Sequence, residues 1–140
     1  MKVRIYTDGG SRGNPGPSAS GAVIKSLRGG LDGEILANVS RYLGTTTNNQ
    51  AEYTAIIIGL EHAKTIGATE VDMLMDSELA VRQLNGVYKV KNPEIAKRFV
   101  EVHNLVQDFK HVTFRHIPRE KNKEADTLVN QCIDEHLARQ

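Results

Sequence analysis

The chain of 140 residues contains one cysteine, no tryptophan and almost no net charge. Its single thiol, Cys132, can build neither a disulfide framework nor a cysteine zinc site, which suits a reducing compartment. We interpret it as a small, half-buried core residue. Because the formal net charge is only +1, the chain has no overall basic field that would attract a polyanion. Any contact with a nucleic acid must therefore come from local groups of basic residues.

Two groups of basic residues are close enough in the sequence to act locally. They are Lys89, Lys91, Lys97 and Arg98, and then Arg115, Arg119, Lys121 and Lys123. Either group could bind phosphate or form ordinary solvated surface, and charge alone favours the second interpretation.

Long apolar runs are also absent, and none approaches the length that crosses a membrane. The N-terminal MKVRIYTDGG begins a strand and lacks the apolar stretch of a signal peptide. We therefore expect a cytoplasmic protein with no membrane partner, and we expect a monomer. The length suits one domain over residues 1–140.

The hydrophobic pattern predicts an α/β protein. Period-two alternation or short apolar runs predict strands over residues 2–7, 20–26, 34–43, 70–75 and 112–116. Helical spacing begins after Thr47 or Asn48 and stops at Gly67, and further helices are predicted over 78–84, 93–109 and 122–138. This order favours a five-stranded mixed sheet, an antiparallel meander plus parallel strands, flanked by helices.

Four acidic residues fall where such a layout would bring them together. Asp8 and Asp76 end two strands that are plausible parallel neighbours, because the connection between them includes a helix. Glu52 is expected in the first turn of the helix after residue 47, and Asp126 near the start of the last helix. Taken singly, each has a simpler explanation. Asp8 could form a turn, and Glu52 could belong to a capping box. Asp76 could form an N-cap pair with Ser77, and Asp126 could complement the helix dipole.

Four clustered carboxylates repel one another, so the cluster destabilises the fold unless cations occupy it. Hard divalent ions, Mg²⁺ above all, prefer an all-oxygen ligand set. Two such ions about 4 Å apart can activate a water molecule and stabilise the leaving oxygen of a phosphodiester.

Four segments carry a resemblance to a known family. TDGGSRGNPGP at residues 7–17, TTNNQAEYTA at 46–55, MDSELAV at 75–81 and HIPREKNKEAD at 116–126 resemble the motifs of type 1 ribonucleases H, in the same order. The resemblance covers almost the whole chain. It implies the ribonuclease H-like fold and an endoribonuclease that cuts the RNA strand of RNA–DNA hybrids, leaving a 5′-phosphate and a 3′-hydroxyl.

Carried over by position, the resemblance implies that Asp8, Glu52, Asp76 and Asp126 are catalytic and bind two Mg²⁺ ions, or Mn²⁺. Many members have a histidine in the loop before the last aspartate. Here His116 and Arg119 are the two candidates, and Arg119 resembles the subgroup in which arginine takes that role. Arginine cannot act as a general base, so its role would be electrostatic.

The family's contacts with the hybrid map onto polar and glycine residues. The positions implied to bind substrate are Gly9, Gly10, Ser11, Asn14, Thr47, Asn48, Asn49, Gln50, Ser77 and Asn122. Amides and hydroxyls suit the minor groove, where the 2′-hydroxyl marks the RNA strand. Asn48 and Asn49 are equally good helix caps, and both roles can hold at once.

Several departures from the family pattern leave strictness for hybrids open. Residues 84–93 are short where many members carry an extra helix and a basic loop, and Glu78 stands where many have glutamine. No tryptophan is available as a platform for the DNA strand, and no hybrid-binding domain is expected upstream. The alternatives are a nuclease that also cuts double-stranded RNA, and a non-catalytic hybrid-binding module. A nucleotide-binding site is weakly indicated, since Gly10, Gly13 and Gly16 match neither common phosphate-loop pattern.

Overall fold

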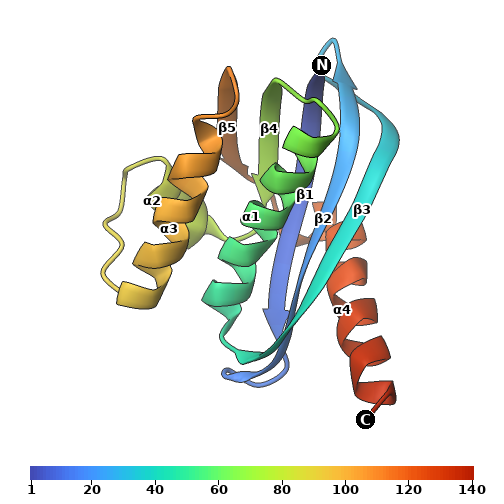
Figure 1. The fold of residues 1–140 in the computed structure, drawn as a ribbon, viewed down its shortest axis with the longest axis vertical. Helices are drawn as coiled ribbons and strands as arrows, with labels where there is room; N and C mark the ends of the chain where they lie inside the picture. Colours follow the sequence, from blue (N-terminus) through green and yellow to red (C-terminus); the bar gives the residue numbers. More distant parts are fainter.

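The fold is one five-stranded sheet with helices on both faces (Figure 1). The computed structural model describes all residues from 1 to 140. Its elements are β1 (Lys2–Ser11), β2 (Gly16–Arg28), β3 (Leu31–Thr46), α1 (Asn48–Thr65), β4 (Glu70–Met75), α2 (Glu78–Leu84), α3 (Pro93–Val106), β5 (His111–His116), a 3₁₀ turn (Arg119–Lys121) and α4 (Lys123–Ala138). None of the helices is long and apolar enough to cross a membrane.

The strand order is β3-β2-β1-β4-β5. β1 pairs antiparallel with β2 and parallel with β4, while β2 pairs antiparallel with β3 and β4 parallel with β5. The predicted mixed sheet, with a meander followed by parallel strands, is therefore confirmed.

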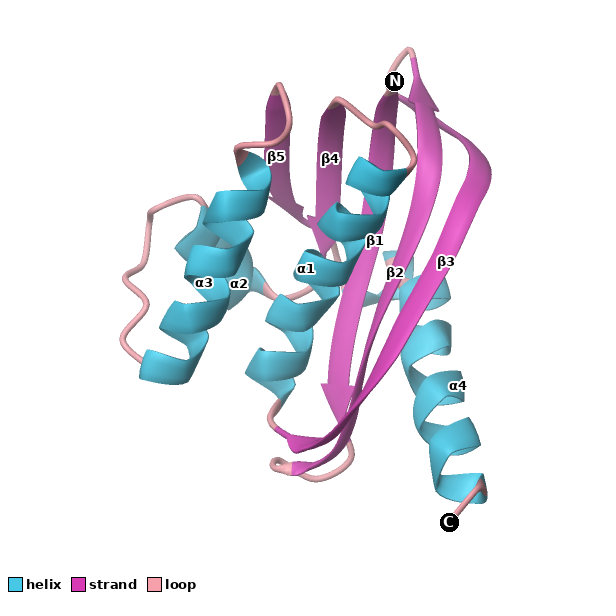
Figure 2. Cartoon of the chain, viewed as in Figure 1, coloured by secondary structure: helices cyan, strands magenta, loops and turns pink.

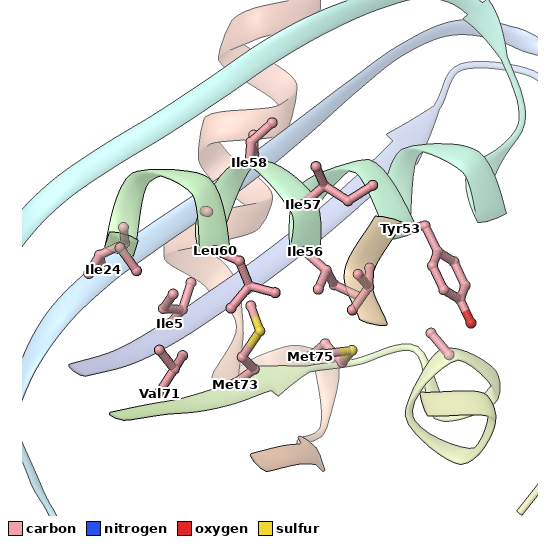
Figure 3. Close-up of a cluster of buried hydrophobic side chains, with 14 of the residues drawn as sticks. Ile5, Ile24, Tyr53, Ile56, Ile57, Ile58, Leu60, Val71, Met73 and Met75 are labelled. Atoms are coloured by element: carbon pink, nitrogen blue, oxygen red, sulfur yellow. The ribbon is translucent and has the colours of Figure 1, made fainter. Parts of the chain in front are cut away.

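Helix α1 packs on one face of the sheet and is buried around most of its circumference (Figures 2 and 3). Its side chains Ile56 and Leu60 are fully buried against Ile5 and Met73 of the sheet. Burying one such aliphatic side chain contributes about 1.5–3 kcal/mol. Gly59 lets the helix approach closely, because an added Cβ would lie 3.2 Å from Ile5 Cγ2.

Helix α4 packs on the opposite face. A Cβ on Gly21 would lie 3.0 Å from Leu128 Cβ of α4, whereas a Cβ on Gly59 of α1 would lie 3.4 Å from Ala22 Cβ. Successive residues of a strand point to opposite faces, so α1 and α4 cover the two sides of β2. The rings of Tyr42 and His136 stack with their centroids 3.6 Å apart and hold α4 against β3.

Beyond the reach of α4, this face is covered by charged side chains. Asp72 is 6% exposed and accepts hydrogen bonds from Arg4, Arg115 and Thr113. Burial alone would raise the pKa of Asp72, but these hydrogen bonds outweigh it and hold the pKa below its ordinary value. A network of paired charges thus takes the place of a covering helix.

Three predictions along the chain differ from the structure. β1 does not end at residue 7 but continues to Ser11, because the hairpin with β2 stays paired up to Ser11 and Ser18. α3 ends at Val106 rather than at residue 109. Glu52 lies one turn further into α1 than predicted, since the helix begins at Asn48 and its first turn holds no acidic residue.

Candidate active site

Asp8 and Asp76 are brought together by the parallel register of β1 and β4. The parallel ladder between these strands ends at Thr7 and Met75, so each aspartate is the first residue beyond that ladder, although Asp8 itself stays paired with β2. Both carboxylates line a small cavity of about 10 Å³, together with Glu52 and Ser77. That volume holds about one water molecule.

Glu52 reaches this cavity because α1 lies directly against Gly9. A Cβ at Gly9 would fall 2.1 Å from the Ala51 carbonyl carbon and 2.3 Å from the Glu52 nitrogen, so no other residue fits there. The buried hydroxyl of Ser20 also fixes this turn of α1, donating to the Ala51 carbonyl oxygen at 2.6 Å. Packing of backbone against backbone therefore sets the position of Glu52 beside Asp8.

Asp126 approaches from the other face of the sheet, on the first turn of α4. Its exposed side chain lines a groove of about 210 Å³ that it shares with Asp8. The four carboxylates thus come from four different elements: β1, α1, the end of β4 and α4. The four side chains therefore lie around one cavity and the groove beside it, although Asp8 is inside β1 rather than at its end and Glu52 is beyond the first turn of α1.

The pKa values of two of these groups show how crowded the cluster is. Burial, followed by the charges of Asp76, Asp126 and Glu52, raises the pKa of Asp8 to about 8. Burial raises the pKa of Glu52 to about 7, with a further rise from Asp76 and partial relief from Ser77 and Arg119. Near neutral pH Asp8 therefore holds a proton and Glu52 is partly protonated unless a cation occupies the site.

The donor set fits a hard divalent cation. The ionisable side chains of the cavity are carboxylates alone, without histidine or cysteine, and such oxygen ligands suit Mg²⁺ or Mn²⁺. No three or more His, Cys, Asp or Glu side chains lie close enough together to coordinate one metal ion as they stand.

Asn122 does not lie where a substrate contact requires. Its side chain is 1% exposed, so it is part of the interior rather than of a binding surface. Its Nδ2 donates to the Thr7 carbonyl oxygen at 2.8 Å and to Asp76 Oδ2 at 3.2 Å, while the backbone carbonyl of Asn122 accepts from the backbone nitrogen of Asp126. The motif indicates the importance of this residue, but the direction of the side chain depends on tertiary packing.

Arg119 and His116 are separated by the structure. Arg119 begins the 3₁₀ turn and lines the groove with Asp8 and Asp126, and its charge lowers the pKa of Glu52. His116 is the exposed last residue of β5 and lines neither the cavity nor the groove of the carboxylates. Only Arg119 therefore faces the carboxylate cluster.

Five of the expected substrate contacts line one open hollow of about 510 Å³: Asn14, Thr47, Asn48, Asn49 and Gln50. Asn14 Oδ1 accepts from the Asn48 nitrogen at 3.1 Å, and Asn48 Oδ1 accepts from the Ser11 nitrogen at 2.9 Å. Thr47 caps α1 by accepting from the Gln50 nitrogen. Helix capping and an exposed polar hollow thus coexist at this end of α1.

The sequence did not reveal every residue around these hollows. Asn92, Glu94 and Ile95, at the start of α3, line the same hollow as Thr47. Arg12 and Asn130 line the groove beside Asp8, where Gly9, Gly10 and Ser11 form one wall. No local pattern links these segments, which meet only through the tertiary fold.

Ser77, one of the expected substrate contacts, caps α2 and faces Glu52.

Comparison with known proteins identifies the family. The family model described as "Reverse transcriptase-like" matches residues 6–132. The crystal structure of ribonuclease H1 from Halobacterium salinarum is 38% identical with a TM-score of 0.90, covering 96% of this chain and 99% of that one. LC11-RNase H1, isolated from compost by a metagenomic approach and crystallised in complex with an RNA/DNA hybrid, is 46% identical, with a TM-score of 0.89 and coverage of 96% and 99%. The chain belongs to the ribonuclease H type 1 family.

Some curated relatives of this ribonuclease H homologue are longer than the chain. It is 43% identical to a bifunctional protein of Mycobacterium tuberculosis but spans 36% of its length. It spans 65% of the length of the ribonuclease HI of Halobacterium salinarum, at 39% identity. The match covers 96% of this chain in both cases.

Proposed function

We propose that the protein is an endoribonuclease that hydrolyses the RNA strand of RNA–DNA hybrids with two divalent metal ions, Mg²⁺ or Mn²⁺. The observation that carries this proposal is the convergence of Asp8, Glu52, Asp76 and Asp126 from four elements on one cavity and groove. A binding module would gain nothing from four negative charges facing a polyanion. The hybrid bound to LC11-RNase H1 supports the choice of substrate.

The carboxylates would hold the ions, which supply an activated water and stabilise the leaving oxygen when bound. Asp8 and Glu52 would release protons on binding the ions, since burial and repulsion raise both pKa values. Arg119 places a permanent positive charge in the groove, on the scissile phosphate or the leaving group. Cleavage leaves a 5′-phosphate and a 3′-hydroxyl.

Substrate selection is assigned to the polar surface beside the cluster. The amides of Asn14, Asn48, Asn49 and Gln50 suit the minor groove, and Thr47 with Asn14 suits a phosphate of the DNA strand. Gly9, Gly10 and Ser11 bring backbone close to the sugar of the RNA strand. Ser77 helps to hold Glu52.

The test compares end-labelled RNA–DNA hybrid, double-stranded RNA and DNA duplex, each with Mg²⁺, Mn²⁺ or chelator, and with Asp76→Asn as the control. Metal-dependent cutting of the RNA strand of the hybrid alone, lost in the variant, supports the proposal. Cutting of double-stranded RNA as well would keep the site but remove strict hybrid specificity. No cutting of the hybrid under any condition would overturn the proposal.

A further inference from the structure

Two arginine side chains line the groove beside the carboxylate cluster. The groove runs between the end of β1 and α4, has a volume of about 210 Å³, and begins at Asp8 and Asp126. Arg119 and Arg12 are its only lysine or arginine residues. Arg119 belongs to the site already described, whereas Arg12 has no role in it.

Arg12 is held in the groove by two residues of α4. Its Nη1 lies 2.6 Å from Asp134 Oδ1, and its Nη2 donates to Asn130 Oδ1 at 3.3 Å and to the Asn130 carbonyl at 3.4 Å. The ion pair is solvated, since the side chains of Arg12 and Asp134 are 40% and 64% exposed. An ion pair this exposed contributes little to stability, so the guanidinium can exchange Asp134 for another anion.

The pairing with α4 is not what fixes the loop that carries Arg12. The Ser11 nitrogen donates to Asn48 Oδ1 at 2.9 Å, and the Ser11 hydroxyl donates to the Thr46 carbonyl at 3.0 Å. The Arg12 nitrogen donates to the Pro17 carbonyl at 2.9 Å. Since these bonds anchor the backbone, the position of the loop does not depend on the contacts of the Arg12 side chain with α4.

The geometry points to Arg12 as a binding site for a phosphodiester of the RNA strand adjacent to the one that is cut. An RNA strand whose scissile phosphate lies at Asp8 and Asp126 would continue along the groove towards Arg12. The carboxylates of Asp8 and Asp126 repel the strand where it enters. A guanidinium with planar, forked donors suits phosphate oxygens at that point. This inference rests on the proposed function and extends it by one phosphate.

The test measures hybrid affinity in an Asp76→Asn background, where cleavage is expected to be lost. Arg12→Gln is expected to raise Kd about fivefold to tenfold and to reduce the salt dependence of log Kd by about one. With Asp76 intact, Arg12→Gln should raise KM and leave kcat within about twofold, because the contact is present in ground and transition states alike. Arg28→Gln, an exposed arginine at the far end of β2, is the matched control and should change nothing.

Asp134→Asn distinguishes phosphate binding by Arg12 from a purely structural role, in which Arg12 only ties its loop to α4. It removes the competing anion from Arg12, so hybrid binding should tighten by about twofold. If Arg12 only ties the loop to α4, Asp134→Asn weakens binding as Arg12→Gln does, and the inference is wrong. An unchanged Kd for Arg12→Gln, or a loss of kcat alone, would also overturn it.

Hybrids with a single uncharged methylphosphonate linkage identify the phosphate. A neutral linkage in the RNA strand, one or two positions from the cut, should abolish the penalty of Arg12→Gln. If only a linkage in the DNA strand does so, the assignment to the RNA strand is overturned. Failure of the proposed function looks different, because the unmodified protein would then cut no hybrid at all.

Discussion

The side-chain amide of Asn122 donates a hydrogen bond to the carboxylate of Asp76, with 3.2 Å between Nδ2 and Oδ2. The same amide donates to the backbone carbonyl of Thr7, the residue before Asp8, and the backbone carbonyl of Asn122 accepts from the backbone nitrogen of Asp126. One buried residue therefore connects the elements that carry three of the four carboxylates. It fixes their spacing without touching solvent.

Asn122→Ala is therefore expected to lower stability and activity without changing hybrid affinity. Leaving the Thr7 carbonyl without its buried partner should cost about 1–3 kcal/mol in the free energy of unfolding. Urea unfolding checks the stability, and steady-state kinetics should show a lower kcat and an unchanged KM. Asn38→Ala on exposed β3 is the control. A raised KM with normal stability would instead return Asn122 to the substrate contacts.

Asp8→Asn is expected to stabilise the metal-free protein while abolishing activity. The pKa of Asp8 is raised to about 8 in the folded protein, against an ordinary value near 3.8. A carboxyl with a raised folded pKa destabilises the fold increasingly as pH rises from about 4 to about 8, on the order of a few kcal/mol at the upper end. Asparagine keeps the shape and removes this cost.

Thermal unfolding in chelator checks this between pH 5 and pH 8. The melting temperature of Asp8→Asn should exceed that of the unmodified protein, and the gap should widen as pH rises. Asp76→Asn should behave similarly, whereas the exposed Asp108→Asn should not. Adding Mg²⁺ should stabilise the unmodified protein more than Asp8→Asn. Equal or lower melting temperatures for both cluster variants in chelator would contradict the crowding of the carboxylates.

The sequence allowed the mixed sheet and the approach of Asp8 to Asp76 to be predicted, because the order of strands and helices along the chain indicates both. A helix between two strands implies parallel neighbours, and strand ends meet at one edge, so Asp8 and Asp76 could be paired in advance. A turn at Asp8 was one alternative, but β1 continues through Asp8 to Ser11, and the neighbouring Gly9 makes room for the backbone of α1. The burial of Asn122 and the approach of Arg12 to α4 depend on side-chain direction and on contacts between distant segments. No spacing rule carries that information.

Glu94→Gln is expected to strengthen hybrid binding. Glu94 lines the polar hollow with Asn14 and Thr47, where a phosphate of the DNA strand is proposed to bind, and its side chain is 61% exposed. Removing a negative charge from this position should lower Kd about twofold to fivefold at low salt, and the gain should fade as salt is added. Glu135→Gln, on the exposed side of α4, is the control and should leave Kd unchanged. A weaker complex for Glu94→Gln would argue against a phosphate in this hollow.

Arg119 and His116 can be distinguished by kinetics. Arg119 lines the groove with Asp8 and Asp126, whereas His116 lines neither this groove nor the carboxylate cavity. Arg119→Ala should therefore lower kcat by about tenfold to a hundredfold, because a fixed positive charge near the reacting phosphate is lost. Arg119→Lys should recover part of this loss, and His116→Ala should change kcat by less than about threefold. Since arginine does not titrate near neutral pH, the pH profile of kcat should keep its shape in Arg119→Ala. A large loss in His116→Ala, with the alkaline or acidic limb of the profile removed, would assign the role to histidine.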